Sequence, residues 1–419
     1  MNRREWLALT AGGLGASITA SAASARSAQS SSLEIERRVA QIIREFEEQG
    51  DHRTATVVDR ASADWLSGQV REAGLEPIQE SFSISRVNPI SGALIAADHR
   101  IDGLPLFDGA FTDAAGIQGR LGQLGTEAEI GLAESPPNTA GAGALGAARR
   151  ANRHRAIVLV TRGGRPGLCP NNADDFLQPF GPPVLQVSSV EREWLTTNAQ
   201  AGASVRLVAH VTRTPADAVN VVTSIAGQDS ALPPLVIMTP RSGWYRCASE
   251  RGGGIACWLE VMRALRASKP RHRILFVASS GHELGHLGIN AFVERRPGIV
   301  PGTNGWMHFG ANIGAASQPG NRLQASDDVF DQMLSREMTD AGLKVDQRVP
   351  RGTVPGGEAE VVHRGGGRYV SIIGTSALFH NADDRGPAAI APGVIAKFCV
   401  AFSALARKLA AGDAPAIIA

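Results

Sequence analysis

The sequence predicts an α/β protein in which helices sandwich a mainly parallel sheet, with a small β-rich domain inserted into it. From Val219 onward, apolar runs of strand character alternate with helical patterns, which is typical of a parallel sheet covered on both faces. Residues 84–215 differ, because they are richer in Gly, Pro and Ala and show short strand patterns instead. We therefore expect one α/β domain, formed by residues 33–83 and 216–411, that is interrupted by an inserted domain.

Two helical patterns come first, over residues 33–49 and 61–73. Gly74-Leu75-Glu76-Pro77 ends the second in the manner of a helix C-cap. Strands and helices then follow by the period and length of their apolar patterns. The expected strands are Ala156–Thr161, Pro183–Val187, Val205–Thr212, Val219–Ile225, Leu235–Thr239, Ile274–Ala278, Gly305–Phe309 and Val370–Ile373, and the later helices are Ile255–Ala267, Leu284–Glu294, Asp328–Ala341 and Ala391–Ala411.

The amino terminus has the features of an export signal. Arg3 and Arg4 precede a weakly apolar stretch that ends at the small residues Ala23-Ser24-Ala25. This pattern predicts a twin-arginine signal peptide over residues 1–25, and hence a periplasmic or secreted protein. No later stretch offers the roughly 18 uninterrupted apolar residues of a membrane span. The net charge of +2, with basic residues scattered along the chain, argues against a nucleic-acid partner.

The most informative motif follows the apolar run Ile274–Ala278. The residues from His282 to His286 read His-Glu-Leu-Gly-His, which is the zincin pattern when it lies on a helix. Here the apolar run ends at Ser279-Ser280-Gly281, so the motif opens a helix after a strand instead. Open α/β sheets keep their active sites at the carboxyl ends of strands. The sequence therefore predicts a functional site of a different kind; the alternative is that both histidines cap a helix and face solvent.

Several segments carry a resemblance to a known family. Ser62–Leu75 resembles the opening helix of the exported zinc aminopeptidases with two co-catalytic metals, a family that also includes the glutaminyl cyclases. Ala156–Gly164 and Gly181–Val187 resemble the protease-associated (PA) insert that many members carry. Asn220-Val221-Val222 leads into the metal region as it does in family members. The resemblance implies zinc and the cleavage of peptide or amide bonds, although function must be argued from the site.

The first half of the expected metal site departs from the family pattern. Where members have His-x-Asp-Ser, this chain has Thr239-Pro240-Arg241-Ser242, so a ligand histidine and its aspartate partner are absent. Glu250 stands at or near the place of the bridging aspartate. The family's Glu-Glu pair, base then ligand, is His282-Glu283.

The second half keeps one ligand. The next aspartate of the family falls on Ala311 or Asn312, depending on a shift of one residue. The last histidine and the aspartate four residues later survive as His380 and Asp384. Glu358 and Glu360 lie where the family carries a Ser-Asp-His beside the substrate.

The resemblance implies one metal position rather than two. Glu283, His380 and Glu250 would hold a single zinc ion and leave an open position for water. His282 would act as the base, and Arg241 would supply the positive charge of the missing metal. Alternatively, Arg241 lines an anion pocket with Arg246 and Arg251, or is the ion-pair partner of Glu250. His286 is expected on the helix surface, with a ligand role as its alternative. The residues expected around the metal and substrate are Asp384, Glu360, Ser242, Asn312 and His286.

These observations favour an exported hydrolase that cleaves a peptide or small amide with one zinc ion. One alternative is a catalytically inactive relative that binds peptides or small molecules. The other is an acyl-transfer or cyclising enzyme of the glutaminyl cyclase type. Convergence of Glu250, Glu283 and His380 on one point would favour the enzyme, whereas direct pairing of Arg241 with Glu250 and Glu283 would favour the inactive relative.

Overall fold

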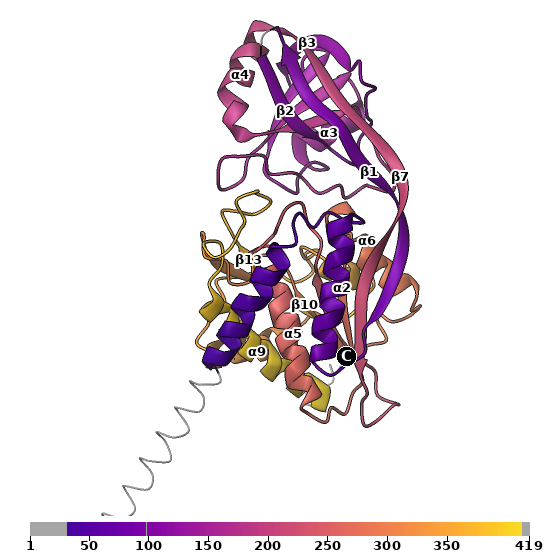
Figure 1. The fold of residues 1–419 in the computed structure, drawn as a ribbon, viewed down its shortest axis with the longest axis vertical. Coiled ribbons are helices and arrows are strands. Elements are labelled where there is room, and N and C mark those ends of the chain that lie inside the picture. The colour runs from indigo at the N-terminus through magenta and orange to yellow at the C-terminus, as the bar shows by residue number, and fades with distance from the viewer. Residues whose placement is uncertain (1–31, 98, 413–419) are drawn as a thin grey trace, which may run out of the picture.

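A single sheet connects the two parts of the chain in the computed structural model, which describes residues 32–412 except residue 98 (Figure 1). The predicted signal peptide lies outside the described residues. Within them the strand order is β1-β2-β6-β5-β4-β3-β7-β9-β8-β10-β13-β11-β12. The predicted α/β class is confirmed. The strands are β1 (Ile78–Ala96), β2 (His99–Pro105), β3 (Ile117–Gln123), β4 (Ile130–Ser135), β5 (Ala156–Thr161), β6 (Val184–Val187), β7 (Ser204–Ile225), β8 (Leu235–Pro240), β9 (Ile274–Ser279), β10 (Gly305–Phe309), β11 (Gly320–Ala325), β12 (Gln347–Arg348) and β13 (Tyr369–Thr375).

The centre of the sheet is parallel, as predicted. Strands β9, β8, β10 and β13 run side by side in the same direction, and β7 and β11 flank them in the antiparallel sense. Strands β8 and β9 are buried along their whole length. Burial on both faces explains why they are continuous apolar runs rather than alternating ones.

Helices cover both faces of this sheet. The helix over residues 32–47 packs with α2, α5, α7 and α9 against one face, in a core that includes Phe46, Leu66, Trp258 and Phe402. Helices α6 and α8 cover the other face. Among the described residues, no helix combines the length and apolar character that crossing a membrane requires. The later helices are α2 (Val57–Glu72), α3 (Gly143–Ala151), α4 (Arg192–Ala201), α5 (Gly252–Arg266), α6 (Leu287–Glu294), α7 (Asp328–Asp340), α8 (Ala359–Arg364) and α9 (Pro392–Ala411).

Two very long strands link the inserted segment (residues 84–215) to the rest. Strands β1 and β7 pair along almost their whole length and run from one part of the molecule to the other (Figure 1). The apolar pattern predicts two separate strands, Val205–Thr212 and Val219–Ile225, whereas in the structure both belong to the single strand β7. Pairing with β1 continues through Pro215, which a two-stranded ribbon tolerates because its outer edge needs no donor.

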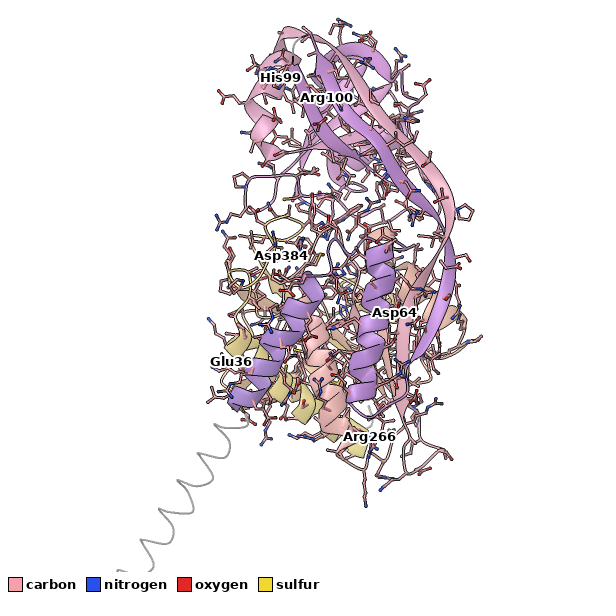
Figure 2. The ribbon with its side chains drawn as sticks, in the orientation of Figure 1. Glu36, Asp64, His99, Arg100, Arg266 and Asp384 are labelled. Carbon is pink, nitrogen blue, oxygen red and sulfur yellow. The ribbon has the colours of Figure 1, made fainter. Side chains whose placement is uncertain are left out.

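The inserted segment has its own apolar core. Leu121, Leu132, Val158 and Leu207 pack together there with side chains of α4. Strand β5 has the predicted bounds, whereas β2, β3 and β4 and helices α3 and α4 were not predicted. A separate apolar cluster, which includes Val87, Phe176 and Trp244, joins the inserted segment to the α/β part. Side chains fill this junction near Asp384, and His99 and Arg100 mark the far end of the inserted segment (Figure 2).

Candidate functional site

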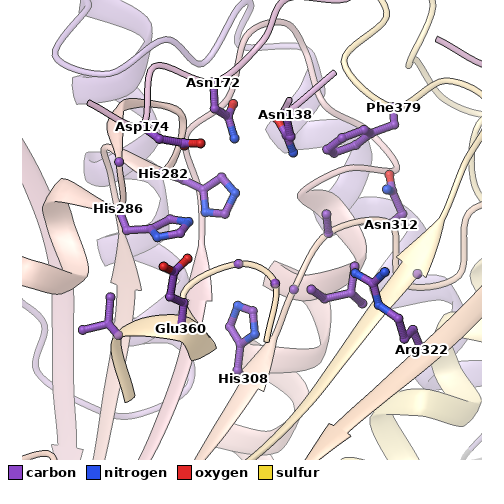
Figure 3. Close-up of a pocket in the computed structure, with 18 of the residues that line it drawn as sticks. Asn138, Asn172, Asp174, His282, His286, His308, Asn312, Arg322, Glu360 and Phe379 are labelled. Carbon is purple, nitrogen blue, oxygen red and sulfur yellow. The ribbon is translucent and has the colours of Figure 1, made fainter. Parts of the chain in front are cut away.

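A cavity of about 860 Å³ opens where the carboxyl ends of the central strands face the inserted segment. Asn138, Asn172 and Asp174 reach it from the inserted segment, while His282 and His308 reach it from the α/β part (Figure 3). The position agrees with the rule that open α/β sheets bind ligands outside the carboxyl ends of their strands. The site is therefore shared between the two parts of the chain.

The turn after β9 directs His282 into this cavity. Gly281 and Gly285, with φ of 80° and 78°, bracket a single turn of 3-10 helix, and His286 is also left-handed. Residues in this conformation do not continue an α-helix, so α6 begins at Leu287 and not at the predicted Leu284. The motif thus spans a turn, as expected for a site that is not a zincin. His286 lines the cavity beside His282, with ring centroids 4.9 Å apart, which corrects its expected place on the helix surface.

His282 is a neutral imidazole beside a buried carboxylate. Burial, followed by the positive charge of Arg251 and the nearby His286, lowers the pKa of His282 well below its ordinary value. Its Nδ1 lies 3.7 Å from Oε1 of Glu358, which is fully buried and accepts a hydrogen bond of 2.5 Å from the hydroxyl of Ser279. A neutral imidazole oriented by a carboxylate can accept a proton from a substrate or a water molecule.

The carboxylate of Glu283 is held by the protein itself. Its Oε1 accepts hydrogen bonds from the backbone N and the hydroxyl of Thr54, at 2.8 and 2.6 Å. Its Oε2 accepts one of 2.7 Å from Ser242, whose hydroxyl oxygen also accepts from the N of Gly281. Ser242 therefore supports the turn below His282, and both oxygens of Glu283 are occupied.

Glu250 pairs with an arginine. Nη2 of Arg251 lies 2.8 Å from Oε1 of Glu250, and its Nε donates to the carbonyl of Ser242 at 2.6 Å. Nε2 of His380 lies 3.4 Å from the same Glu250 oxygen. Burial alone would raise the pKa of Glu250, but Arg251 and His380 outweigh it and lower that pKa below the ordinary value. Glu250 is thus a buried carboxylate ion with a guanidinium as its counter-ion.

Asp384 positions the Glu250 backbone rather than the His380 ring. Its carboxylate accepts hydrogen bonds from the backbone N of Ser249 and of Glu250, at 2.8 and 2.9 Å. Burial raises the pKa of Asp384 to about 6, although these hydrogen bonds oppose the shift. The Nδ1 atom of His380 instead contacts the carbonyl of Pro170 in the inserted segment, at 2.5 Å.

Arg241 does not belong to the site, which corrects its predicted catalytic role. Its guanidinium is fully buried and lies 2.8 Å from the Asp59 carboxylate at the start of α2. It also donates to the carbonyls of Asp59 and Val219. These three acceptors bind the buried guanidinium of Arg241, so its side chain joins α2 to β7. The arginine that pairs with Glu250 is Arg251.

The residues present do not fit the single zinc ion of the prediction. Glu250 and His380 lie close together, but a guanidinium already contacts the Glu250 oxygen, and Glu283 is bound to Thr54 and Ser242. Across the described residues, no group of three or more His, Cys, Asp or Glu side chains could hold a metal ion. A tetrahedral zinc site needs at least three such donors around one point.

The cavity wall holds buried polar atoms without hydrogen-bond partners. Nδ1 of His308 is hydrogen-bonded to Oγ of Ser371 at 2.8 Å, and Nε2 of the same ring has no partner. Asn312, at the place predicted for a lost ligand, lines the cavity with its Oδ1 also unpartnered. Since buried polar atoms are almost always paired, such a group beside a cavity indicates a ligand. Among the described residues of the cavity wall, the buried atoms without a hydrogen-bond partner are Nδ1 of His282, Nε2 of His308, Oδ1 of Asn312 and Nε of Arg322.

Sequence reasoning missed or misplaced several members of the site. Arg251 was weighed as an anion-pocket residue, and its position directly after Glu250 was the available signal for an ion pair. Glu358 was placed beside the substrate together with Glu360; the structure buries Glu358 behind His282 and leaves Glu360 in the cavity wall. No sequence signal marked Arg322, which reaches the cavity from β11.

The fold is similar to that of solved zinc aminopeptidases. A scan against protein-family models and a search of curated proteins found no match to the sequence. Solved structures do match. The zinc aminopeptidase BSAP from Bacillus subtilis is similar with a TM-score of 0.73 and 16% identity, over 88% of this chain and 94% of that chain. A peptidase M28 precursor from Shewanella amazonensis is similar with a TM-score of 0.68 and 14% identity, over 91% and 96%.

A third structure of the same class agrees. An aminopeptidase from an Aneurinibacillus strain is similar with a TM-score of 0.67 and 12% identity, over 90% of this chain and 93% of that chain. Because the similarity covers nearly all of each chain, it includes the inserted segment as well as the α/β part. At these identities the comparison establishes a common fold, and the chemistry depends on the side chains described above.

Proposed function

We propose that this protein binds a peptide or a small amide in the cavity between its two parts, without a zinc centre. Aminopeptidases with the same fold act on peptides, and the cavity here lies at the carboxyl ends of β8, β9 and β10, where such folds bind ligands. The unpartnered atoms of His308 and Asn312 supply hydrogen bonds for an amide group.

The observation that carries this proposal is the contact between Arg251 and Glu250. A positive side chain lies 2.8 Å from Glu250, which the resemblance places at or near the family's bridging aspartate. A zinc ion at that oxygen would have to displace a buried guanidinium and leave it without a counter-ion, which is strongly unfavourable. The predicted one-zinc mechanism is therefore replaced by metal-free binding.

A second candidate function, hydrolysis without a metal, is favoured by the pair formed by His282 and Glu358. The imidazole faces the cavity, and the carboxylate 3.7 Å away would stabilise it after it accepts a proton from water. Arg251, close enough to lower the pKa of His282, would favour the negative charge that develops on a substrate carbonyl oxygen. No contact in the site favours acyl transfer over this reaction.

The experiment combines three measurements on the folded, exported protein. Metal content is determined by plasma mass spectrometry, peptide binding by calorimetry, and hydrolysis with a panel of aminoacyl and peptidyl amides. We expect zinc far below one ion per chain, on the order of 0.1 or less, because the site lacks three donors. We also expect measurable binding of peptides. One zinc per chain, lost in Glu283→Ala and His380→Ala, would overturn the proposal.

Hydrolysis distinguishes the two candidates. Turnover that survives a chelator and falls at least about a hundredfold in His282→Ala would establish the second candidate, since general-base catalysis contributes about that much. His99→Ala serves as a matched control because it removes a histidine at the far end of the inserted segment, outside the cavity wall. Binding without turnover would leave the first candidate alone.

Two further predictions remain proposals. The inserted segment resembles a PA domain, and we infer that it closes the cavity, because Asn138, Asn172 and Asp174 contribute to its wall.

Export by the twin-arginine route is tested by replacing Arg3 and Arg4 with lysine. Retention of the precursor in the cytoplasm is the expected result, and unchanged export would contradict the prediction.

A further inference from the structure

The cavity carries opposite charges on two of its sides. Carboxylates line one side, and a single arginine lines the other, while imidazoles and an amide lie between them. This separation bears on which ligand the proposed binding function serves. Figure 3 shows Asp174, His286 and Glu360 on one side, Arg322 on the opposite side, and His282 and His308 in the region between.

Arg322 is a cavity cation without a counter-ion. It lies in β11, is half-buried, and has no carboxylate of the described residues within ion-pairing distance. Its Nε is buried and lacks a hydrogen-bond partner. The neighbouring acceptor, Oε1 of Gln324, is already occupied by the backbone N of Gly356. A planar guanidinium with free donors facing a cavity is suited to a carboxylate.

The opposite side is acidic. Asp174 and Asp175 come from the inserted segment, and Glu360 comes from α8. One cation faces them, Arg364, whose Nη2 lies 2.5 Å from Oε1 of Glu360. His286 also lies on this side, beside His282. With three carboxylates and one arginine, this side of the cavity has a net negative charge, which favours the binding of an ammonium group.

The middle of the cavity is suited to a peptide bond. His308 and Asn312 are each more than nine-tenths buried, and each has a side-chain atom without a partner, while the ring of His282 lines the cavity with its Nδ1 towards Glu358. The hydrogen bond between Nδ1 of His308 and Oγ of Ser371 fixes the orientation of that ring, so its Nε2 remains available in the cavity. These donors and acceptors match a carbonyl and an amide N–H.

The size of the cavity limits the ligand. Its volume of about 860 Å³ lies in the range of pockets for small ligands, which is roughly 300–1,000 Å³. A peptide of two or three residues is a ligand of this size.

We propose that the ligand is a short free peptide of two or three residues. Its ammonium group lies against Asp174 and Glu360, and its terminal carboxylate lies against Arg322. The proposal rests on the proposed binding function and adds the requirement that both peptide termini are free. An aminopeptidase-like site that needs only a free amino terminus would accept the same peptide with its carboxyl terminus blocked.

Calorimetry with a panel of dipeptides that have uncharged side chains tests whether both termini must be free. Each peptide is compared with its C-terminal amide and its N-acetyl form, on the wild-type protein and on Arg322→Gln and Asp174→Asn. We expect the amide to bind at least tenfold more weakly than the free acid to the wild-type protein. Arg322→Gln should remove that difference, and Asp174→Asn should reduce the difference between the free and the N-acetyl peptides. Arg336→Gln, at an exposed arginine of α7, should change neither comparison.

The possible results separate this inference from the proposed function. Equal affinity of the free acid and the amide for the wild-type protein would overturn the two-ended ligand and leave peptide binding intact. Absence of binding by every peptide form would overturn both. The wild-type comparison needs no variant, so the test holds even where Arg322→Gln does not fold. Arg322→Lys, which keeps the charge, should restore part of the preference for the free acid.

Discussion

The guanidinium of Arg251 lies 2.8 Å from the carboxylate of Glu250, and each side chain is 1% exposed. Two residues adjacent in the sequence thus form a buried ion pair at the start of α5. The carbonyl of Ser242 holds Nε of Arg251, so the pair is fixed by a neighbouring loop as well. In a fold whose relatives include zinc enzymes, this pair supplies positive charge from the chain itself.

The first prediction concerns the stability of this pair. Glu250→Ala should lower the free energy of unfolding by about 3–5 kcal/mol, because it leaves Arg251 charged and without a counter-ion in the interior. Replacing both residues, as Glu250→Leu with Arg251→Met, should recover most of that loss. Urea denaturation provides the measurement.

The control for this prediction is an exposed pair. Arg336 and Asp340 lie 4.0 Å apart on α7, with side chains 78% and 65% exposed. Asp340→Ala should change the free energy of unfolding by less than about 1 kcal/mol. A Glu250→Ala variant as stable as this control would show that the buried pair is not important for folding.

The second prediction concerns metal binding. The melting temperature of the wild-type protein should not change with zinc or with a chelator. In Arg251→Ala, Glu250 and His380 are released from the guanidinium, and their oxygen and nitrogen lie 3.4 Å apart, close to the ligand separation in tetrahedral zinc sites. These are two donors, one fewer than a zinc site of the protein alone needs, so zinc should stabilise this variant only weakly, and the added His380→Ala change should abolish the effect.

Differential scanning fluorimetry measures both effects. A wild-type melting temperature that rises with zinc and falls with a chelator would contradict the idea that Arg251 takes the place of a metal.

The third prediction compares two glycines. A Cβ at Gly374 would lie 1.9 Å from the carbonyl oxygen of Asn312, whereas a Cβ at Gly68 in α2 would meet nothing within 4 Å. Gly374→Ala should displace the Asn312 loop, lower stability and weaken ligand binding. Gly68→Ala should raise stability by about 0.5–1 kcal/mol, since Ala is the better helix residue. Comparable stability of the two variants would contradict the close approach at Asn312.

The fourth prediction concerns pH. Burial, opposed by Glu358 and reinforced by His286 and Arg251, lowers the pKa of His308 to about 4 from an ordinary 6.5. Between these values the unfolded chain binds a proton at this residue and the folded chain does not. The free energy of unfolding therefore falls as the pH is lowered from 6.5 towards 4, by up to about 1.4 kcal/mol per pH unit for each such histidine.

Urea denaturation at a series of pH values measures this slope. His282 contributes in the same direction, because its pKa is also lowered. His308→Gln should make the slope shallower over this range, provided that the variant retains its hydrogen bond to Ser371. An unchanged slope would show that His308 does not titrate in this way.

The elements with strong apolar patterns were predicted well from the sequence. The bounds of β5 and β10 agree with the structure, and α7 and α9 differ by one residue at an end. These segments are buried along a face or throughout, so their composition reflects their environment directly. The ribbon of β1 and β7 was not predicted as such, since much of it is exposed and its polar residues resemble a linker.

For the site, the sequence located the turn after β9 correctly. His282, Asn312 and Glu360 lie in the cavity wall, and Ser242 lies beneath it, where it supports the turn. The sequence did not show whether Arg241 or Arg251 pairs with Glu250, because Arg241 follows a strand and Arg251 precedes a helix, both near Glu250. Which arginine reaches the carboxylate depends on Asp59, which satisfies Arg241 from α2.

The sequence by itself determined the α/β class and the turn after β9 that lines the cavity. These properties depend on local apolar periodicity and on which residue types are present. Tertiary structure decided the partners of the charged groups. Glu283 is bound by Thr54, more than two hundred residues away in the chain, and Glu250 is bound by the residue beside it. Buried charges must find counter-ions or hydrogen bonds, and packing alone brings the available ones within reach.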